Sequence, residues 1–346
     1  MTVTAVNRQW LLARYAPQSL QSDNFIFHEA PFVQRDLADG EILVRNRILS
    51  LGPSTRGRLT GFMQNRVLPP IAIGAPITSV AESIVLESAH PAFPVGATIW
   101  GMAAWEDYTY LHSDRALSFV LPRSLGTRAE PLHLNMLTAY FGLMKIGIPR
   151  AGETLVVSAA AGSVGFMAAQ IGRANGCRVI GIAGGSAKTA MLIDKGKLDG
   201  AIDYRSEAVG ERLKDLCPDG IDIYFDNVGD DLLDRIVDLM NVHGRIVISG
   251  QIAKYDARGH GVGLQNLSAV VANRLRLQGF VVFDHAAEFT EALLTLADWI
   301  DEGKIASNLD LRTGFDQLPA SFIDLFNGGN RGALLVRIAD AAGKPA

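Results

Sequence analysis

The sequence predicts an α/β protein in which a doubly wound parallel sheet follows a mainly β domain. Three observations support this prediction. Short β-branched runs between Gly and Pro turns fill residues 7–120, strand and helix patterns alternate from residue 154 to about residue 301, and a small-residue turn at 158–165 joins a strand directly to a helix. Repeated β–α units of this length are typical of parallel strands covered by helices on both faces.

The first part of the chain is expected to be mostly β. Strand patterns bounded by turn residues lie at 41–50, 78–85 and 94–101. A lone strand pattern near the end, at 332–338, most simply returns to this first domain. We therefore expect a first domain over 1–130 that is completed by 310–346, and a second domain over 131–309.

The second part opens with an apolar helical stretch that begins near Leu132. Strands then alternate with helices, which begin near Ser186, run through Leu213 and Leu239, and span about 287–301. The predicted strands are 154–158, 178–182, 201–204, 221–225, 244–249 and 277–283.

Composition excludes several classes of protein. The chain has 346 residues, of which 48% are hydrophobic and 20% charged, with a net charge of −4. This charge gives no reason to expect nucleic acid or a membrane surface as partner. No segment approaches the roughly 18 apolar residues of a membrane span, and the first residues lack the apolar core of a signal peptide. Two cysteines form no disulfide framework, so we expect a cytoplasmic protein.

The turn at 158–165 has the pattern of a phosphate-binding loop. It reads A-x-G-x-x-G from Ala160 to Gly165. Gly162 lets the backbone approach a pyrophosphate, Gly165 lets the helix pack against the strand, and the amides of Ser163 and Val164 at the helix start face the negative charge. The same small residues also occur in ordinary tight strand–helix turns.

The end of the second strand indicates which nucleotide binds. A site for NAD needs an acid there for the ribose hydroxyls, but the first acid is Asp194. A glycine turn, a hydroxyl and a cation stand in its place and suit a 2′-phosphate. The alternative interpretation is that Lys188 is only a solvated helix residue and Tyr204 only a half-buried residue at a strand end. The residues expected to flank the 2′-phosphate of NADP(H) are Gly184, Ser186, Lys188, Tyr204 and Arg205.

Three further strand ends offer contacts to a dinucleotide, because ligands bind at the carboxyl ends of parallel strands. Asn227 follows the strand at 221–225 and could bond the cofactor, although Asn-Val-Gly is also a common turn. Gly250 stands at the next strand end. The backbone groups of Phe280 and Val282, on the last strand, could meet a nicotinamide carboxamide.

Nearly the whole chain resembles one family. It is similar to the medium-chain dehydrogenase/reductase superfamily and, within it, to the zinc-independent branch of leukotriene hydroxydehydrogenases and prostaglandin reductases. That branch includes bacterial curcumin reductases and plant alkenal double-bond reductases. The resemblance is carried by the segments 7–14, 137–143, 158–165, 176–185 and 224–229.

The resemblance implies a GroES-like catalytic domain on a Rossmann domain that binds NADP(H), usually in a homodimer. It places Lys188 and Tyr204 at the 2′-phosphate and Asn227 in the cofactor site. Tyr255 matches a tyrosine near the nicotinamide ribose, and Asn330 matches an asparagine that contacts the cofactor. Thr138, within the matching segment 137–143, is also expected at the cofactor.

The residues argue against metal chemistry. A catalytic zinc needs about three Cys, His or acid ligands and a structural zinc about four thiolates. The two cysteines lack C-x-x-C spacing, and the histidines are scattered. Hydride addition to an alkene conjugated to a carbonyl needs only hydrogen-bond donors at the carbonyl oxygen. Tyr255 is the candidate donor or proton relay; it could equally be a loop tyrosine that packs between domains.

Several residues depart from the family pattern. Ser54 and Thr55 stand where an aromatic and a thioether side chain are usual, Met136 replaces a glycine and follows Asn135, and Ala333 replaces a lysine. Ser54, Thr55 and Met136 are therefore candidates to contact the substrate and to change its preference. We expect an NADPH-dependent reductase of the C=C bond of α,β-unsaturated ketones or aldehydes. The alternatives are a quinone or carbonyl reductase, or a non-catalytic protein that binds NADPH.

Overall fold

The chain forms two compact units in a computed structural model that describes residues 3–61, 68–112, 117–130, 132–252 and 264–339. The first unit comprises Met1–Gly126 and Leu309–Ala346, and the second Thr127–Asn308. Among the described residues, no helix has the length and apolar character needed to cross a membrane.

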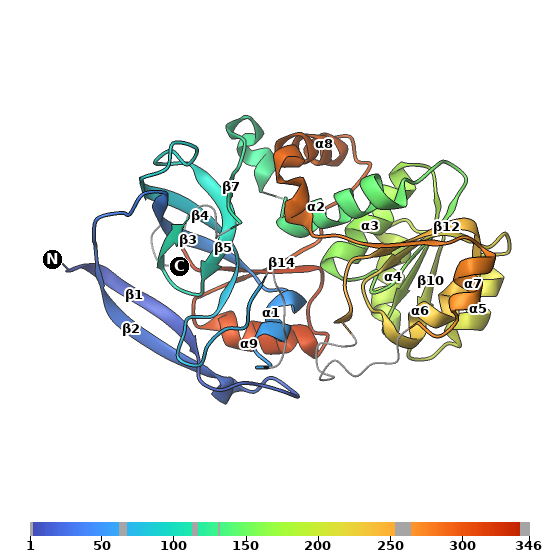
Figure 1. Cartoon of the computed structure of the whole chain (residues 1–346), viewed down its shortest axis with the longest axis horizontal. Helices are drawn as coiled ribbons and strands as arrows, with labels where there is room; N and C mark the ends of the chain where they lie inside the picture. Colours follow the sequence, from blue (N-terminus) through green and yellow to red (C-terminus); the bar gives the residue numbers. More distant parts are fainter. Residues whose placement is uncertain (1–2, 62–67, 113–116, 131, 253–263, 340–346) are drawn as a thin grey trace. The chain divides into compact units, whose positions relative to one another are not determined.

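The first unit is built on a seven-stranded sheet with the order β14-β15-β3-β4-β5-β7, in which β6 also pairs with β3. Strands β1 and β2 form a separate antiparallel pair (Figure 1). Two helices accompany the sheets, α1 at Pro53–Arg58 and α9 at Gln317–Phe326. The strands are β1 (Val3–Leu12), β2 (Phe25–Val33), β3 (Glu41–Ser50), β4 (Thr78–Ser88), β5 (Thr98–Ala104), β6 (Tyr108–His112), β7 (Phe119–Val120), β14 (Leu309–Thr313) and β15 (Ala333–Arg337).

Buried and partly buried residues alternate along β4, so one face of this strand packs on the core. In β4 every second residue is buried from Ser79 to Val85, as expected for a strand with one face on a core. The C-terminal segment completes the sheet, because β15 pairs antiparallel with β3. The expected lone strand at the end of the chain is wrong in one respect. β14 and α9 precede it in the same unit, and β14 pairs with β15 in parallel.

The second unit contains a six-stranded parallel sheet with the order β10-β9-β8-β11-β12-β13. This order confirms the predicted doubly wound α/β fold, in which the order of the strands reverses between the two central strands, β8 and β11. All four residues of β8 are buried, as both faces are covered. The strands are β8 (Thr154–Val157), β9 (Arg178–Ala183), β10 (Gly200–Asp203), β11 (Ile221–Asp226), β12 (Met240–Ile248) and β13 (Arg276–Gly279).

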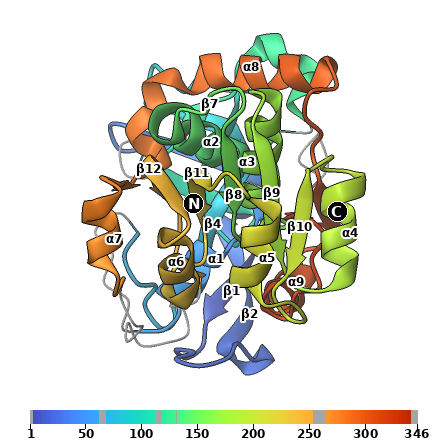
Figure 2. The ribbon, with the colours of Figure 1, turned by 90° about the vertical axis from the view of Figure 1, so that its right-hand side faces the viewer.

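Helices cover both faces of this sheet (Figure 2). One face packs Val156, Ile180, Tyr224 and Ile246 against α5 and α6. On the other face, Leu155 lies beside Gly172 of α3. The helices are α2 (Leu134–Phe141), α3 (Ser163–Ala174), α4 (Ser186–Asp194), α5 (Val209–Leu216), α6 (Asp230–Val237), α7 (Leu267–Ala272) and α8 (Phe289–Asp301).

The structure confirms the helical stretch after Leu132 and corrects two expected boundaries. The apolar stretch after Leu132 forms α2, and its last turn widens into a π-helical segment at Gly142–Gly147. The helix expected to run through Leu239 ends at Val237, because β12 already begins at Met240. The strand expected at 277–283 ends at Gly279, where its pairing with β12 stops.

Candidate functional site

The turn between β8 and α3 exposes the start of a helix at the point where the strand order reverses. Ala159 adopts a left-handed backbone with φ of 47°, and the Gly162 amide donates to its carbonyl at 2.9 Å. Helix α3 then begins at Ser163 without a side-chain cap. The first-turn amides of a helix have no partner within the helix. The start of α3 therefore offers the amides of Ser163, Val164 and Gly165 to an anion.

Two small residues hold this turn close to its neighbours. A Cβ at Gly165 would lie 2.4 Å from the carbonyl oxygen of Ala159, so only glycine allows the helix to approach the turn. The close contact that a side chain at position 165 would make is therefore with the turn after β8. Ala160 is fully buried and its amide donates to Ile182 of β9. Ala160 thus serves packing, whereas Gly162 is half-buried at the helix start.

The end of β9 and the end of β10 meet at one corner of the same sheet. Tyr204 is 56% exposed. A Cβ at Gly184 would lie 2.8 Å from its ring and 2.9 Å from Nε of Arg205, so both side chains cover this glycine. Ser186 and Lys188 stand in the first turn of α4, which begins directly after the glycine pair. The structure therefore brings together the five residues expected around a 2′-phosphate.

A carboxylate that the sequence analysis did not consider lies at this corner. Asp203 ends β10, and its Oδ1 accepts the backbone amides of Gly185 at 2.8 Å and of Arg205 at 3.0 Å. These two hydrogen bonds, that of Gly185 first, lower the pKa of the Asp203 carboxyl. Because its Oδ1 is bound to the backbone, Asp203 fastens the two loops to each other. The only available signal was an acid directly before Tyr204, on the third strand rather than the second.

The carboxyl end of β11 is organised by a second carboxylate that was not predicted. Asp226 is fully buried. Its Oδ1 accepts the Tyr224 hydroxyl at 2.8 Å and the amides of Val228 and Gly229 at 3.0 and 2.9 Å. Burial, and then the charge of Asp226, raise the pKa of Tyr224 well above its usual value, so this hydroxyl stays a donor.

Asn227 joins the end of β11 to the phosphate turn. Its Nδ2 donates to the carbonyl of Ser158 at 2.7 Å, and its backbone amide donates to Oγ of Ser158 at 2.9 Å. Asn227 is 6% exposed. One of its two side-chain amide hydrogens is thus bound to the protein. The next strand end is tied to the same point, because the Gly250 amide donates to the carbonyl of Asp226 at 3.1 Å.

The residues expected on the last strand lie beyond it. Phe280 follows β13, and its ring would be 2.9 Å from a Cβ at Gly142, so the ring packs on the end of α2. Val282 begins a short 3₁₀ segment at Val282–Glu288. On α2 itself, Thr138 is half-buried and Met136 is fully buried.

The remaining candidates belong to the first unit or lie outside the described residues. Ser54 is exposed and Thr55 buried, both on α1 of the first unit. Asn330 donates from Nδ2 to the carbonyl of Gly332 at 2.9 Å, just before β15. Tyr255 falls within 253–263, outside the described residues.

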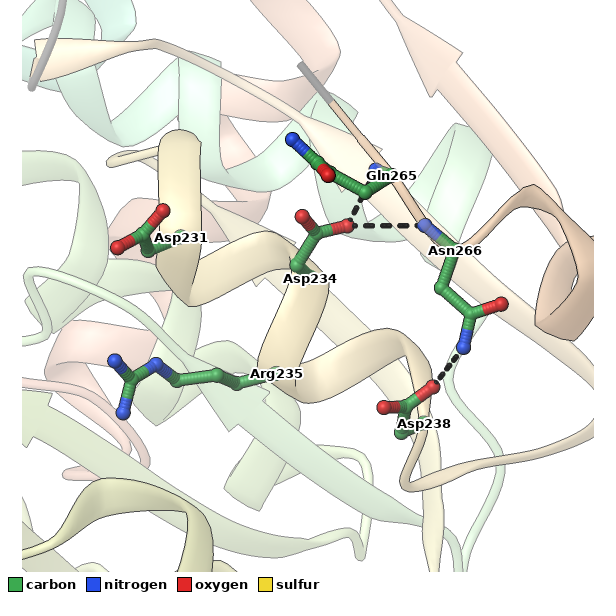
Figure 3. Close-up of a pocket in the computed structure, with 6 residues that line it drawn as sticks. All are labelled: Asp231, Asp234, Arg235, Asp238, Gln265 and Asn266. Carbon is green, nitrogen blue, oxygen red and sulfur yellow. Dashed lines mark hydrogen bonds between the residues drawn. The ribbon is translucent and has the colours of Figure 1, made fainter. Parts of the chain in front are cut away.

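A cavity of about 460 Å³ lies along α6. Three aspartates line it together with Arg235, Gln265 and Asn266 (Figure 3). Asp234 accepts the backbone amide of Gln265 at 2.7 Å, and Asp238 accepts the side-chain amide of Asn266. These carboxylates secure the start of α7 and would repel phosphate, so the cavity does not suit a dinucleotide.

The donor set does not fit zinc. Within the described residues, no group of three or more His, Cys, Asp or Glu side chains is placed to hold a metal ion. Cys177 and Cys217 are both buried, and burial raises the pKa of each thiol to about 11.

Comparisons with known proteins agree with this architecture. Residues 8–119 match the family described as the N-terminal domain of oxidoreductase, and residues 163–299 match the family described as zinc-binding dehydrogenase. The NADPH-dependent curcumin reductase of Escherichia coli (strain K12) is 34% identical over 339 residues, which cover 96% of this chain and 97% of that protein. The (+)-pulegone reductase of Mentha piperita is 34% identical over 343 residues, or 96% of this chain and 99% of that protein.

Solved structures give the same result. CurA from Vibrio vulnificus, in complex with NADPH, has a TM-score of 0.81 and 33% identity, over 95% of this chain and 98% of that chain. The parallel order of the second sheet, the small-residue turn between β8 and α3, and these full-length relatives point to one family. The chain belongs to the medium-chain dehydrogenase/reductase superfamily, in the zinc-independent branch of leukotriene hydroxydehydrogenases and prostaglandin reductases.

Proposed function

We propose that this protein is an NADPH-dependent oxidoreductase that reduces the C=C bond of α,β-unsaturated ketones and aldehydes. The observation that supports it most is the corner at the ends of β9 and β10. The carboxylate of Asp203 is engaged by two backbone amides there, while Lys188 and Arg205 supply positive charge. A site of this charge favours a 2′-phosphate over the bare ribose hydroxyls of NAD.

The residues of the second unit would hold NADP(H) along the strand ends. Gly184, Ser186, Lys188, Tyr204 and Arg205 would surround the 2′-phosphate. The amides at the start of α3 would bind the pyrophosphate. Asn227 and Gly250 would line the site beyond the reversal of strand order, with Thr138 and the backbone of Phe280 and Val282. Asn330, from the first unit, is proposed as a further cofactor contact.

The proposed reaction needs little from the protein beyond binding and hydrogen bonding. Bound NADPH would supply the hydride that adds to the β-carbon of the substrate. The chain must donate a hydrogen bond to the carbonyl oxygen, which gains negative charge. The enolate that forms must then gain a proton at the α-carbon to give the saturated product. We propose Tyr255 for the hydrogen bond to the carbonyl or for the relay of this proton from solvent, and Ser54, Thr55 and Met136 as residues that shape the substrate pocket.

The cofactor assignment is tested by removing one cation. Lys188→Ala should raise KM for NADPH about tenfold or more, because one charge-assisted contact to the 2′-phosphate is lost. KM for NADH, which lacks this phosphate, should change little. Lys214→Ala is the matched control, since Lys214 is an exposed lysine of α5 paired with Glu211. Tighter binding of NADH than of NADPH by the native protein would overturn the assignment.

The reaction is tested by following the loss of NADPH absorbance with a panel of enones, quinones and simple ketones. Turnover with enones, and product analysis showing a saturated carbonyl compound, are expected. Turnover with quinones or ketones alone would make the protein a quinone or carbonyl reductase, and binding without turnover would make NADPH a structural ligand. Tyr255→Phe should lower kcat with enones; unchanged turnover would remove the tyrosine from the mechanism.

We further propose that the first unit is the catalytic domain, that the second binds NADP(H), and that two chains form a homodimer in the cytoplasm. One edge of the second sheet supports the dimer. β13 is an edge strand, and Leu267 and Val271 of the neighbouring helix α7 are 60% and 75% exposed. Exposed strand edges and aliphatic side chains favour association with another chain.

A further inference from the structure

A side chain on α2 contacts the hydroxyl at the start of α3. Nδ2 of Asn135 donates to Oγ of Ser163 at 2.8 Å, and both residues are half-buried. Asn135 lies in the first turn of α2, and Ser163 is the first residue of α3. The two residues are 28 positions apart in the sequence, so this contact exists only because the two helices pack together.

The contact determines what the serine hydroxyl can do. A serine has one hydroxyl hydrogen and two lone pairs. Because the Asn135 amide occupies one lone pair, the hydroxyl hydrogen is directed to another acceptor, and accepting one hydrogen bond strengthens the hydroxyl as a donor. Ser163 stands beside the backbone amides of Val164 and Gly165, which are donors at the uncapped start of α3. An anion is the acceptor that suits this position.

We propose that Asn135 is a positioning residue of the nucleotide site, which holds the Ser163 hydroxyl as a donor to the pyrophosphate. This inference rests on the proposed function, since the pyrophosphate is that of NADP(H). It also gives a role to a residue in one of the segments that depart from the family pattern. Asn135 acts through Ser163 and does not itself contact the phosphate.

The experiment compares two ligands by titration calorimetry. NADPH carries both the pyrophosphate and the 2′-phosphate, whereas adenosine 2′-monophosphate carries only the latter. Asn135→Ala and Ser163→Ala should each raise the Kd for NADPH about three- to tenfold, the usual effect of one hydrogen bond. Asn135→Asp should raise it further, since a carboxylate accepts the hydrogen bond of the serine hydroxyl and repels the phosphate. All three variants should bind adenosine 2′-monophosphate within twofold of the native protein.

Two controls separate positioning from general damage. The double variant Asn135→Ala/Ser163→Ala should bind NADPH no more weakly than Ser163→Ala alone, because Asn135 acts only through that hydroxyl. Asn175→Ala removes a comparable amide at the other end of α3, where Nδ2 donates to Ile171 at 2.8 Å, and should leave both affinities unchanged. Lys188→Ala should raise the Kd for both ligands.

The outcomes are distinct. Equal weakening of both ligands by Asn135→Ala, additive losses in the double variant, or unchanged NADPH affinity would each overturn the role of Asn135. Failure of the native protein to bind NADPH would instead overturn the proposed function. Thermal unfolding of each variant, measured without ligand, shows whether a change in affinity follows from a loss of fold.

Discussion

Gly165 lies where the first turn of α3 crosses the turn that follows β8. Its missing side chain leaves room for the backbone of Ala159 and Ala160, which a Cβ would approach to 2.4 and 2.9 Å. These are backbone atoms, so they cannot rotate away as a side chain can. The sequence predicted that this glycine lets the helix pack against the strand, but the structure shows that the turn after the strand requires it.

Gly165→Ala should therefore move the start of α3 and weaken NADPH binding. We expect the free energy of unfolding to fall by about 1–3 kcal/mol, the usual cost of overpacking. Urea unfolding and NADPH titration measure the two effects. Gly210→Ala is the matched control on α5, where a Cβ meets nothing within 4 Å. This variant should gain about 0.5–1 kcal/mol from better helix propensity. Equal stability of both variants would contradict the packing argument.

His133 makes stability depend on pH. It precedes α2, and burial lowers its pKa to about 4. In the unfolded chain a histidine has a pKa of about 6.5. Between pH 6.5 and 4 the unfolded state therefore binds a proton that the folded state does not, so stability falls as pH falls.

The difference between the two pKa values corresponds to about 3 kcal/mol of stability lost by pH 4. His133→Leu should lose this dependence, so its urea midpoint should fall less steeply than that of the native protein from pH 7 to 4.5. His28→Leu, at an exposed position of β2, should retain the native slope. Parallel pH curves for the native protein and His133→Leu would show that this histidine does not titrate as proposed.

At the scale of elements, the carboxyl end of β11 connects three loops of the candidate site. Asp226 binds the Tyr224 hydroxyl and the turn after its own strand, while its backbone carbonyl accepts the amides of Ser249 and Gly250. Asn227 adds the link to Ser158 at the end of β8. These hydrogen bonds fix the strand ends to the central strand and keep this edge of the sheet, the candidate ligand site, in one arrangement.

Removing one donor from this network should loosen the edge. Tyr224→Phe keeps the buried ring but leaves Asp226 Oδ1 with one hydrogen bond fewer, so stability should fall by about 1–2 kcal/mol. The Kd for NADPH should rise with it. Urea unfolding measures the stability, and NADPH titration measures the Kd. Tyr140→Phe, on a half-buried side chain of α2, should have a smaller effect on both. An unchanged Kd for NADPH in Tyr224→Phe would show that this hydrogen-bond network does not support nucleotide binding.

At the scale of the whole molecule, the proposed dimer is tested by mass. Light scattering after gel filtration should give twice the 37.2 kDa of one chain. Val271→Lys, which places a charge on the exposed face of α7, should shift the protein toward the mass of a monomer. Leu311→Lys is the control, because Leu311 is 41% exposed on β14 of the first unit. A native mass of one chain would rule out the homodimer.

Much of the fold could be predicted because its signals are local. The strand–turn–helix segment at 154–165 and the alternation of strands and helices are properties of neighbouring residues, and the parallel sheet confirms them. Boundaries were less predictable where tertiary pairing ended an element. β13 stops at Gly279 although the apolar pattern continues to Phe283, because only residues 276–279 pair with β12.

The sequence by itself determined the doubly wound sheet, the position of the small-residue turn between β8 and α3, and the absence of an acid directly after the second strand. Tertiary structure decided which polar groups remain available for a ligand. Asp203 is engaged by Gly185, Asn227 by Ser158, and Ser163 by Asn135. The partners of these contacts are 18, 69 and 28 residues apart. The order of strands and the packing of helices bring them together, and no local pattern of residues specifies such a pairing.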